Sequence, residues 1–139
     1  MNRLIILFST LFLLCACGNK LSPEEQALHT AQETALSSYQ NLLAGRYEAF
    51  LSSRIGMDSI PDSYRQQLKV SYKQFMTQQQ KAHGGINSIN VSRAEFMSES
   101  NGEAIPNNVQ VFLVINYADS VQEEIVVPMV QHNGRWMMK

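Results

Sequence analysis

Residues that could carry out acid–base or metal chemistry are few in this 139-residue chain and lie far apart. His29, His83 and His132 are its only imidazoles, and none has a second ligand at metal-binding spacing such as His-x-x-x-His. His83 is expected in the last turn of a helix, where a cation interacts favourably with the helix dipole. The histidines therefore predict no metal site, and no cofactor is expected.

The carboxylates form no recognisable catalytic set either. Asp62 is expected to stabilise a helix start and Asp119 to lie in a turn, which leaves Asp58, in a loop after Gly56, as the one candidate base. Glu123 and Glu124 are neighbours on an expected strand, so they should point to opposite faces of the sheet. There is no Ser/His/Asp set and no glycine loop that could hold phosphate. The sequence thus predicts no catalytic residue and a protein that is not an enzyme.

The strongest chemical signature lies at the N-terminus. Arg3 precedes the apolar run Leu4–Leu14, which has the length of a signal-peptide core but is too short to span a bilayer. Leu14-Cys15-Ala16-Cys17 follows and resembles the bacterial lipobox. The resemblance implies cleavage between Ala16 and Cys17 and acylation of the Cys17 thiol. We expect a signal peptide at residues 1–16, and a lipidated cysteine with a short tether at residues 17–21.

This signature predicts a location and one partner. Acylated Cys17 would anchor the protein in a lipid bilayer, since two or three acyl chains give stable attachment. No Asp follows Cys17, so the expected location is the cell envelope, at the outer membrane. The precursor carries 11 basic and 12 acidic residues without a basic stripe, which argues against nucleic acid as a partner.

Hydrophobic periodicity predicts one domain over residues 22–139. Apolar residues at helical spacing predict helices from Ser22 to Gly45, over residues 46–54, and from about Asp62 to Gly84. Ser22 and Glu25 have the spacing of a capping box at the start of the first helix. Alternating patterns predict strands over residues 86–99, 109–118, 121–131 and 135–139, with a bulge or an edge at Pro128. A turn or loop with Asn101-Gly102 and Pro106 is expected at residues 100–108, and the strand over 109–118 is expected to be central, because both of its faces carry apolar residues. The expected fold class is α+β, with three N-terminal helices packed on a four-stranded antiparallel sheet.

Three segments within this pattern resemble a known family. They are Leu-Leu-Ala-Gly-Arg-Tyr at residues 42–47, Gly-Gly-Ile at 84–86 and Asn-Gly-Arg-Trp-Met-Met at 133–138. Together they resemble the DUF4878 group, small bacterial lipoproteins of unknown function with an NTF2-like (cystatin-like) fold. The resemblance implies a curved sheet that wraps a long helix into a cone. The open end of such a cone can hold a ligand, an active site or a partner, and the family supplies no catalytic residues.

Two sets of apolar residues are candidate sites. A pocket in the cone is expected to be lined by aromatic side chains, namely Tyr39, Phe50, Phe75 and Trp136. The outer face of the sheet could serve as an interaction face if helices cover only the other side. Its apolar residues are Phe112, Val114, Val126 and Val130.

The preferred functional hypothesis is a membrane-anchored, non-catalytic module that binds a small apolar ligand or an envelope protein. One alternative is a small-molecule enzyme of the isomerase or dehydratase type that uses the cone pocket. In NTF2-like enzymes of that type, an Asp base and Tyr or Asp donors act inside the cone. Another alternative is a structural subunit of an envelope complex.

Overall fold

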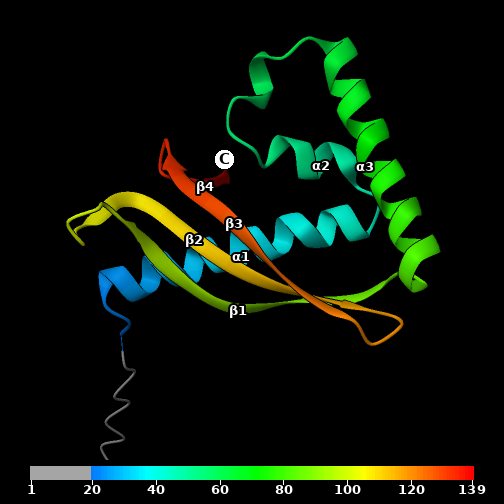
Figure 1. Cartoon of the computed structure of the whole chain (residues 1–139). Coiled ribbons are helices and arrows are strands. Elements are labelled where there is room, and N and C mark those ends of the chain that lie inside the picture. Colours follow the sequence, from blue (N-terminus) through cyan, green and yellow to red (C-terminus); the bar gives the residue numbers. More distant parts are fainter. Residues whose placement is uncertain (1–19) are drawn as a thin grey trace, which may run out of the picture.

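The computed structural model describes residues 20–139 and contains three α-helices followed by a four-stranded antiparallel sheet (Figure 1). The strands follow one another in the order β1-β2-β3-β4, so the sheet is a simple meander. This arrangement confirms the expected α+β class. The elements are α1 (Pro23–Leu43), α2 (Tyr47–Ser52), the 3-10 helix η1 (Met57–Ser59), α3 (Asp62–His83), β1 (Ile86–Ser98), β2 (Ala104–Tyr117), β3 (Gln122–His132) and β4 (Arg135–Met138).

The predicted signal peptide, with Ala16, and the predicted lipidation site Cys17 lie outside the described residues, so cleavage and lipidation stay predictions. Within residues 20–139, no helix combines the length and the hydrophobicity needed to cross a membrane.

The second strand was expected at Val109 but begins at Ala104. The chain reverses directly after β1, where the Glu99 N–H donates to the Glu103 carbonyl over 2.8 Å. Pro106, which suggested a loop, lies in β2 before its pairing with β3 begins at Asn108. One side of the strand is open there, and the proline therefore interrupts no hydrogen bond with β3.

Helix α1 starts with the predicted capping box. The Glu25 N–H donates to the Ser22 Oγ over 3.2 Å, and the Ser22 N–H donates to the Glu25 carboxylate over 2.8 Å. Ala31 and Ala35 lie one turn apart and are fully buried, which allows the helix backbone to approach the sheet closely. Helix α1 contacts all four strands and forms the central layer against the concave face of the sheet (Figure 1).

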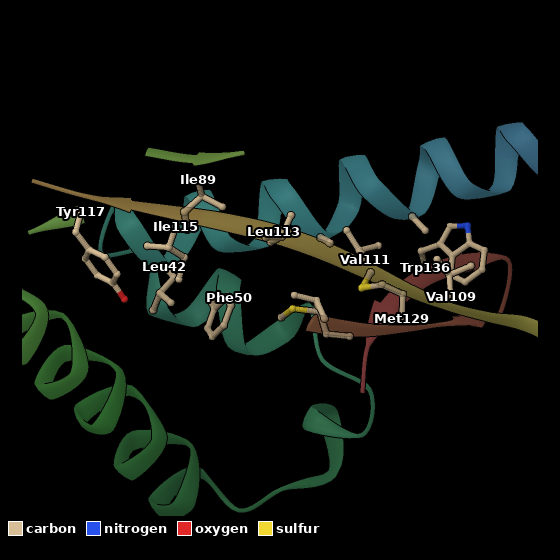
Figure 2. Close-up of a cluster of buried hydrophobic side chains, with 14 residues drawn as sticks. Leu42, Phe50, Ile89, Val109, Val111, Leu113, Ile115, Tyr117, Met129 and Trp136 are labelled. Atoms are coloured by element: carbon tan, nitrogen blue, oxygen red, sulfur yellow. The ribbon is translucent and has the colours of Figure 1, made fainter. Parts of the chain in front are cut away.

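The core lies between α1, α2 and the inner face of the sheet (Figure 2). Strand β2 is central, as predicted, and its alternate residues from Val109 to Tyr117 all point into the core. The other members of the core come from α1, α2, β1, β3 and β4, including Phe50, Met129 and Met138. Within residues 20–139, every buried residue of this core lies at or after Ala31.

Helix α3 stands away from the rest of the domain and is fixed mainly at its two ends (Figure 1). None of its residues is buried. Near its start, the Arg65 Nη1 pairs with the Glu48 Oε1 of α2 at 2.6 Å. At its end, the His83 Nδ1 pairs with the Asp119 Oδ2 of the β2–β3 turn at 2.7 Å. This attachment leaves space between the middle of α3 and the sheet.

Candidate functional site

That space is an apolar cavity of about 390 Å³ between α1, α2, α3 and the sheet. Tyr39, Phe50 and Phe75, three of the four residues expected in a pocket, lie in its wall. The full lining consists of Tyr39, Leu42, Leu43, Phe50, Arg54, Ser71, Tyr72, Phe75, Ile86, Ile89, Ile115, Glu123 and Ile125.

Trp136, the fourth expected pocket residue, does not line this cavity. It is only 8% exposed and lies at the opposite end of the core from Tyr117 (Figure 2). There it borders a separate hollow together with Pro23 and Gln26 at the start of α1. The reason is geometric, because β4 pairs with the end of β3 that is far from the cavity.

Three aromatic rings form one wall of the cavity. Phe50 packs edge-to-face on Tyr39, with ring centroids 5.3 Å apart, and on Tyr72, with centroids 5.0 Å apart. Such pairs are favoured by the quadrupoles of the rings and hold them in defined orientations. Burial raises the pKa of the Tyr39 phenol, and the nearby Arg54 guanidinium opposes that rise.

Two charged side chains of opposite sign face the apolar wall. Glu123 accepts a hydrogen bond of 2.8 Å from the Tyr117 hydroxyl. Burial of the Tyr117 phenol, together with this hydrogen bond and the negative charge of Glu123, raises the Tyr117 pKa to about 12. The Arg54 Nη2 donates to the Lys139 carbonyl over 3.1 Å. The cavity can therefore receive an apolar group whose polar end meets either charge.

His83, which was expected to interact with the dipole of α3, also contacts two side chains at the end of β2 and in the following turn. Its ring stacks on Tyr117, with centroids 4.2 Å apart, and its Nδ1 contacts the Asp119 carboxylate. The hydrogen bond from His83 is the main cause of a lowered Asp119 pKa. Asp58, the candidate base, is exposed on η1 and does not line the cavity. Among residues 20–139, no group of three or more His, Cys, Asp or Glu side chains could hold a metal ion.

The outer face of the sheet is less apolar than the sequence suggested. Phe112 is 7% exposed, because the Arg93 guanidinium lies 3.5 Å above its ring centroid. The expectation that Phe112 adds to an exposed patch is therefore wrong. Val126 is exposed, whereas Val114 and Val130 are half-buried. Arg93 also pairs with Glu124 at 3.2 Å, so charged groups cover the centre of this face.

A larger hollow of about 730 Å³ lies between α2 and α3. Most of its lining residues are exposed, among them Arg46, Glu48 and Lys73. The apolar cavity is the better candidate for a binding site, because a ligand there would contact the core and lose more apolar surface to burial.

Glu123 and Arg54 were missed as site residues in the sequence. Glu123 carries a usable signal, because strand alternation places it on the same face as Ile125 and Val127. Arg54 carries none, since it follows a short helix and reaches the cavity only through the bridge between residue 54 and Met138 of β4.

No protein-family model matches the chain, and no curated protein matches it significantly. Its fold is similar to that of a solved Campylobacter jejuni protein, which carries the provisional description NTF2-like transpeptidase. The superposition has a TM-score of 0.58 at 8% sequence identity and covers 76% of this chain and 94% of the other. At this identity the similarity concerns the fold alone, so membership of the DUF4878 group stays a prediction. The described domain has an NTF2-like α+β cone fold.

Proposed function

We propose that this chain is a lipid-anchored protein of the bacterial cell envelope whose cone cavity binds an apolar group without catalysing a reaction. The observation that carries the binding role is the cavity of about 390 Å³ with its largely apolar wall. Ligand pockets typically measure about 300–1,000 Å³ and combine apolar walls with a few polar groups. Arg54 and Glu123 supply such polar groups here.

The geometry favours binding over catalysis. An isomerase-type site needs a carboxylate base inside the apolar cone. Glu123 is the carboxylate in the cavity lining, but it is exposed to solvent and already accepts the Tyr117 hydroxyl. It is thus better placed to bind a cationic or hydrogen-bonding group than to take a proton from carbon.

The anchoring part of the proposal rests on the residues around Cys17. The apolar run and lipobox-like Leu14-Cys15-Ala16-Cys17 support lipidation, and the missing Asp after Cys17 supports the outer membrane. The DUF4878-type lipoproteins that the sequence resembles have an NTF2-like fold too. We expect that Cys17→Ala abolishes incorporation of labelled palmitate and leaves an unprocessed precursor. Normal labelling of this variant would contradict the anchor.

The binding role can be tested with N-phenyl-1-naphthylamine, an apolar dye that fluoresces in dry sites. The domain beginning at Lys20 is suitable, because it contains all the core residues found between residues 20 and 139. Ser71→Trp should fill the cavity from α3 and weaken dye binding at least tenfold. Thr77→Trp is the matched control, because both positions are exposed on α3 and both hydroxyls donate to a carbonyl one turn earlier, but Thr77 does not line the cavity.

Equal dye binding by both variants and the unmodified domain would place the dye elsewhere and count against the cavity. Loss of binding in both variants, with unchanged melting temperatures, would also count against it, since the control position lies outside the cavity.

A further inference from the structure

One edge of the sheet lacks a neighbouring strand beside the cavity. Strand β3 runs over Gln122–His132, but β4 pairs only with the part from Met129 to His132. The Pro128 carbonyl is also occupied, because it accepts from the Lys139 N–H. The six residues before it, 122–127, pair with β2 on one side only. At about 3.3 Å per residue, this open edge is about 20 Å long.

The register shows which backbone groups face the open side. The Val121 carbonyl accepts from the Tyr117 N–H over 2.9 Å. The backbone N–H and carbonyl groups of odd-numbered residues in β3 are therefore directed towards β2. The Pro128 carbonyl accepts from the Lys139 N–H over 3.0 Å. The backbone N–H and carbonyl groups of even-numbered residues are therefore directed away from β2. Glu124 and Val126 therefore each direct an N–H and a carbonyl away from the sheet, where β4 does not reach.

This register also explains Pro128, which was expected at a bulge or an edge. The pairing of β2 with β3 contains no register shift, so Pro128 lies at an edge and not in a bulge. The Pro128 nitrogen lies on the side away from β2, so the missing N–H removes no hydrogen bond between β2 and β3.

The open edge forms one wall of the cavity. Glu123 and Ile125 of β3 line it from the sheet, and Ser71, Tyr72 and Phe75 of α3 line it from the opposite side. A single extended strand laid along residues 122–127 would pass between the sheet edge and α3. Its side chains would alternate between the cavity and the outer face.

We infer that an extended peptide segment binds here as an added strand, with its backbone paired to Glu124 and Val126 and an apolar side chain in the cavity. This inference rests on the proposed binding function of the cavity. Strand addition combines main-chain hydrogen bonds, which give affinity, with pockets for alternate side chains, which give specificity. The apolar group that the cavity receives is then a side chain of the peptide.

The charges at the cavity define the peptide further. The peptide residue opposite Ile125 faces the apolar wall, and the residue two positions along faces Glu123. Glu123 accepts the neutral Tyr117 hydroxyl and forms no ion pair within the part of the chain that is described. A Lys or Arg of the peptide, two positions from its apolar residue, could form an ion pair with Glu123. The peptide pattern is therefore an apolar and a basic residue separated by one residue.

The geometry favours a peptide over a second copy of this chain. A second copy would bring its own sheet to the open edge, and α3 stands on that side of the cavity. A single strand needs only the space between the edge and the helix.

The test is selection of a random heptapeptide phage library on the immobilised domain from Lys20, followed by affinity measurements on the selected peptides. Val126→Pro removes the N–H on the open edge and leaves the pairing with β2, as Pro128 already does two residues further along. Val126→Thr keeps that N–H and is the matched control. We expect Val126→Pro to weaken peptide binding at least tenfold and Val126→Thr to change it less than twofold.

Two further measurements keep the inference falsifiable if Val126→Pro folds poorly. Methylation of alternate peptide nitrogens should abolish binding for one alternate set and spare the other, because a strand pairs through one edge. Glu123→Gln should reduce the enrichment of Lys and Arg at the peptide position two residues from the apolar one.

The outcomes separate this inference from the proposed function. Equal binding by peptides methylated in either set, or by well-folded Val126→Pro, would overturn strand addition. Failure to enrich peptides while N-phenyl-1-naphthylamine still binds the cavity would overturn the peptide and leave the proposed function intact. A concentration-dependent dimer that Val126→Pro dissociates would assign the edge to a second copy and overturn the inference too.

Discussion

Tyr117→Phe removes one hydroxyl and should change the stability of the domain differently at neutral and at alkaline pH. Tyr117 is 4% exposed, and its hydroxyl donates to Glu123. A hydrogen bond to a charged group contributes about 1.5–3 kcal/mol. Because water can replace the lost donor at the exposed Glu123, we expect about 1 kcal/mol of destabilisation at pH 7.

The alkaline effect follows from the raised pKa. The Tyr117 pKa is about 12 in the folded domain and about 10 in the unfolded chain. A raised pKa of an acid stabilises the fold fully below pH 10, and this contribution is lost as the pH rises through 12. The gap of about two units corresponds to about 2.7 kcal/mol, of which about 1.4 kcal/mol is lost by pH 11.

The assay is urea unfolding of the domain from Lys20 between pH 7 and pH 11.5, followed by the fluorescence of Trp136, the only tryptophan. The stability of the unmodified domain should fall faster above pH 10 than that of Tyr117→Phe. Tyr64→Phe is the control, since Tyr64 is 48% exposed, and its curve should follow the unmodified domain. If the difference between Tyr117→Phe and the unmodified domain stays constant from pH 9 to pH 11.5, the reasoning about burial and Glu123 is refuted.

Three further predictions concern the cavity wall, the end of α3 and the start of α1. Phe50→Ala should cost about 3–5 kcal/mol in urea unfolding, because it leaves a void at a buried ring between two tyrosines; a loss below 1 kcal/mol would mean that the aromatic wall is not packed as described. Asp119→Asn should make the free energy of unfolding fall less steeply below about pH 4. The Asp119 pKa is lowered in the fold, so the carboxylate stabilises the fold at pH values above its unfolded pKa, and this contribution is lost as the pH falls. Equally steep falls for the variant and the unmodified domain would argue against the contact with His83. Ser22→Ala should cost about 1 kcal/mol in urea unfolding, because the Glu25 N–H loses its side-chain acceptor. An unchanged free energy of unfolding would argue against the capping box.

The attachment of α3 has a consequence for the cavity. Its apolar side chains Tyr72, Phe75 and Met76 are only partly buried against the core. The helix is instead held by ion pairs near its ends, through Arg65 and His83. Added apolar contact along the middle of α3 is therefore available to a ligand, and this is the contact that the proposed peptide side chain would make.

Much of the fold followed from local patterns in the sequence. The capping box at Ser22, the glycine that ends α1 and the alternation along β2 each act over a few residues, so the sequence predicted these elements and their order. The same alternation gave the inner face of the sheet from Val109 to Tyr117. The position of Ala104 in β2 was missed, since the reversal after β1 depends on cross-strand pairing and not on the local loop signals at Asn101 and Pro106.

The sequence by itself determined the class of fold and the identity of the central strand, because each depends on residue spacing within a segment. For the same reason it predicts the anchor at Cys17, which stays a prediction. Only the tertiary structure decided which aromatic residues share a cavity, that Glu123 and Arg54 face it, and that Arg93 covers Phe112. These features join segments far apart in the chain. Their positions depend on how far α3 stands from the sheet, and no local pattern encodes this distance.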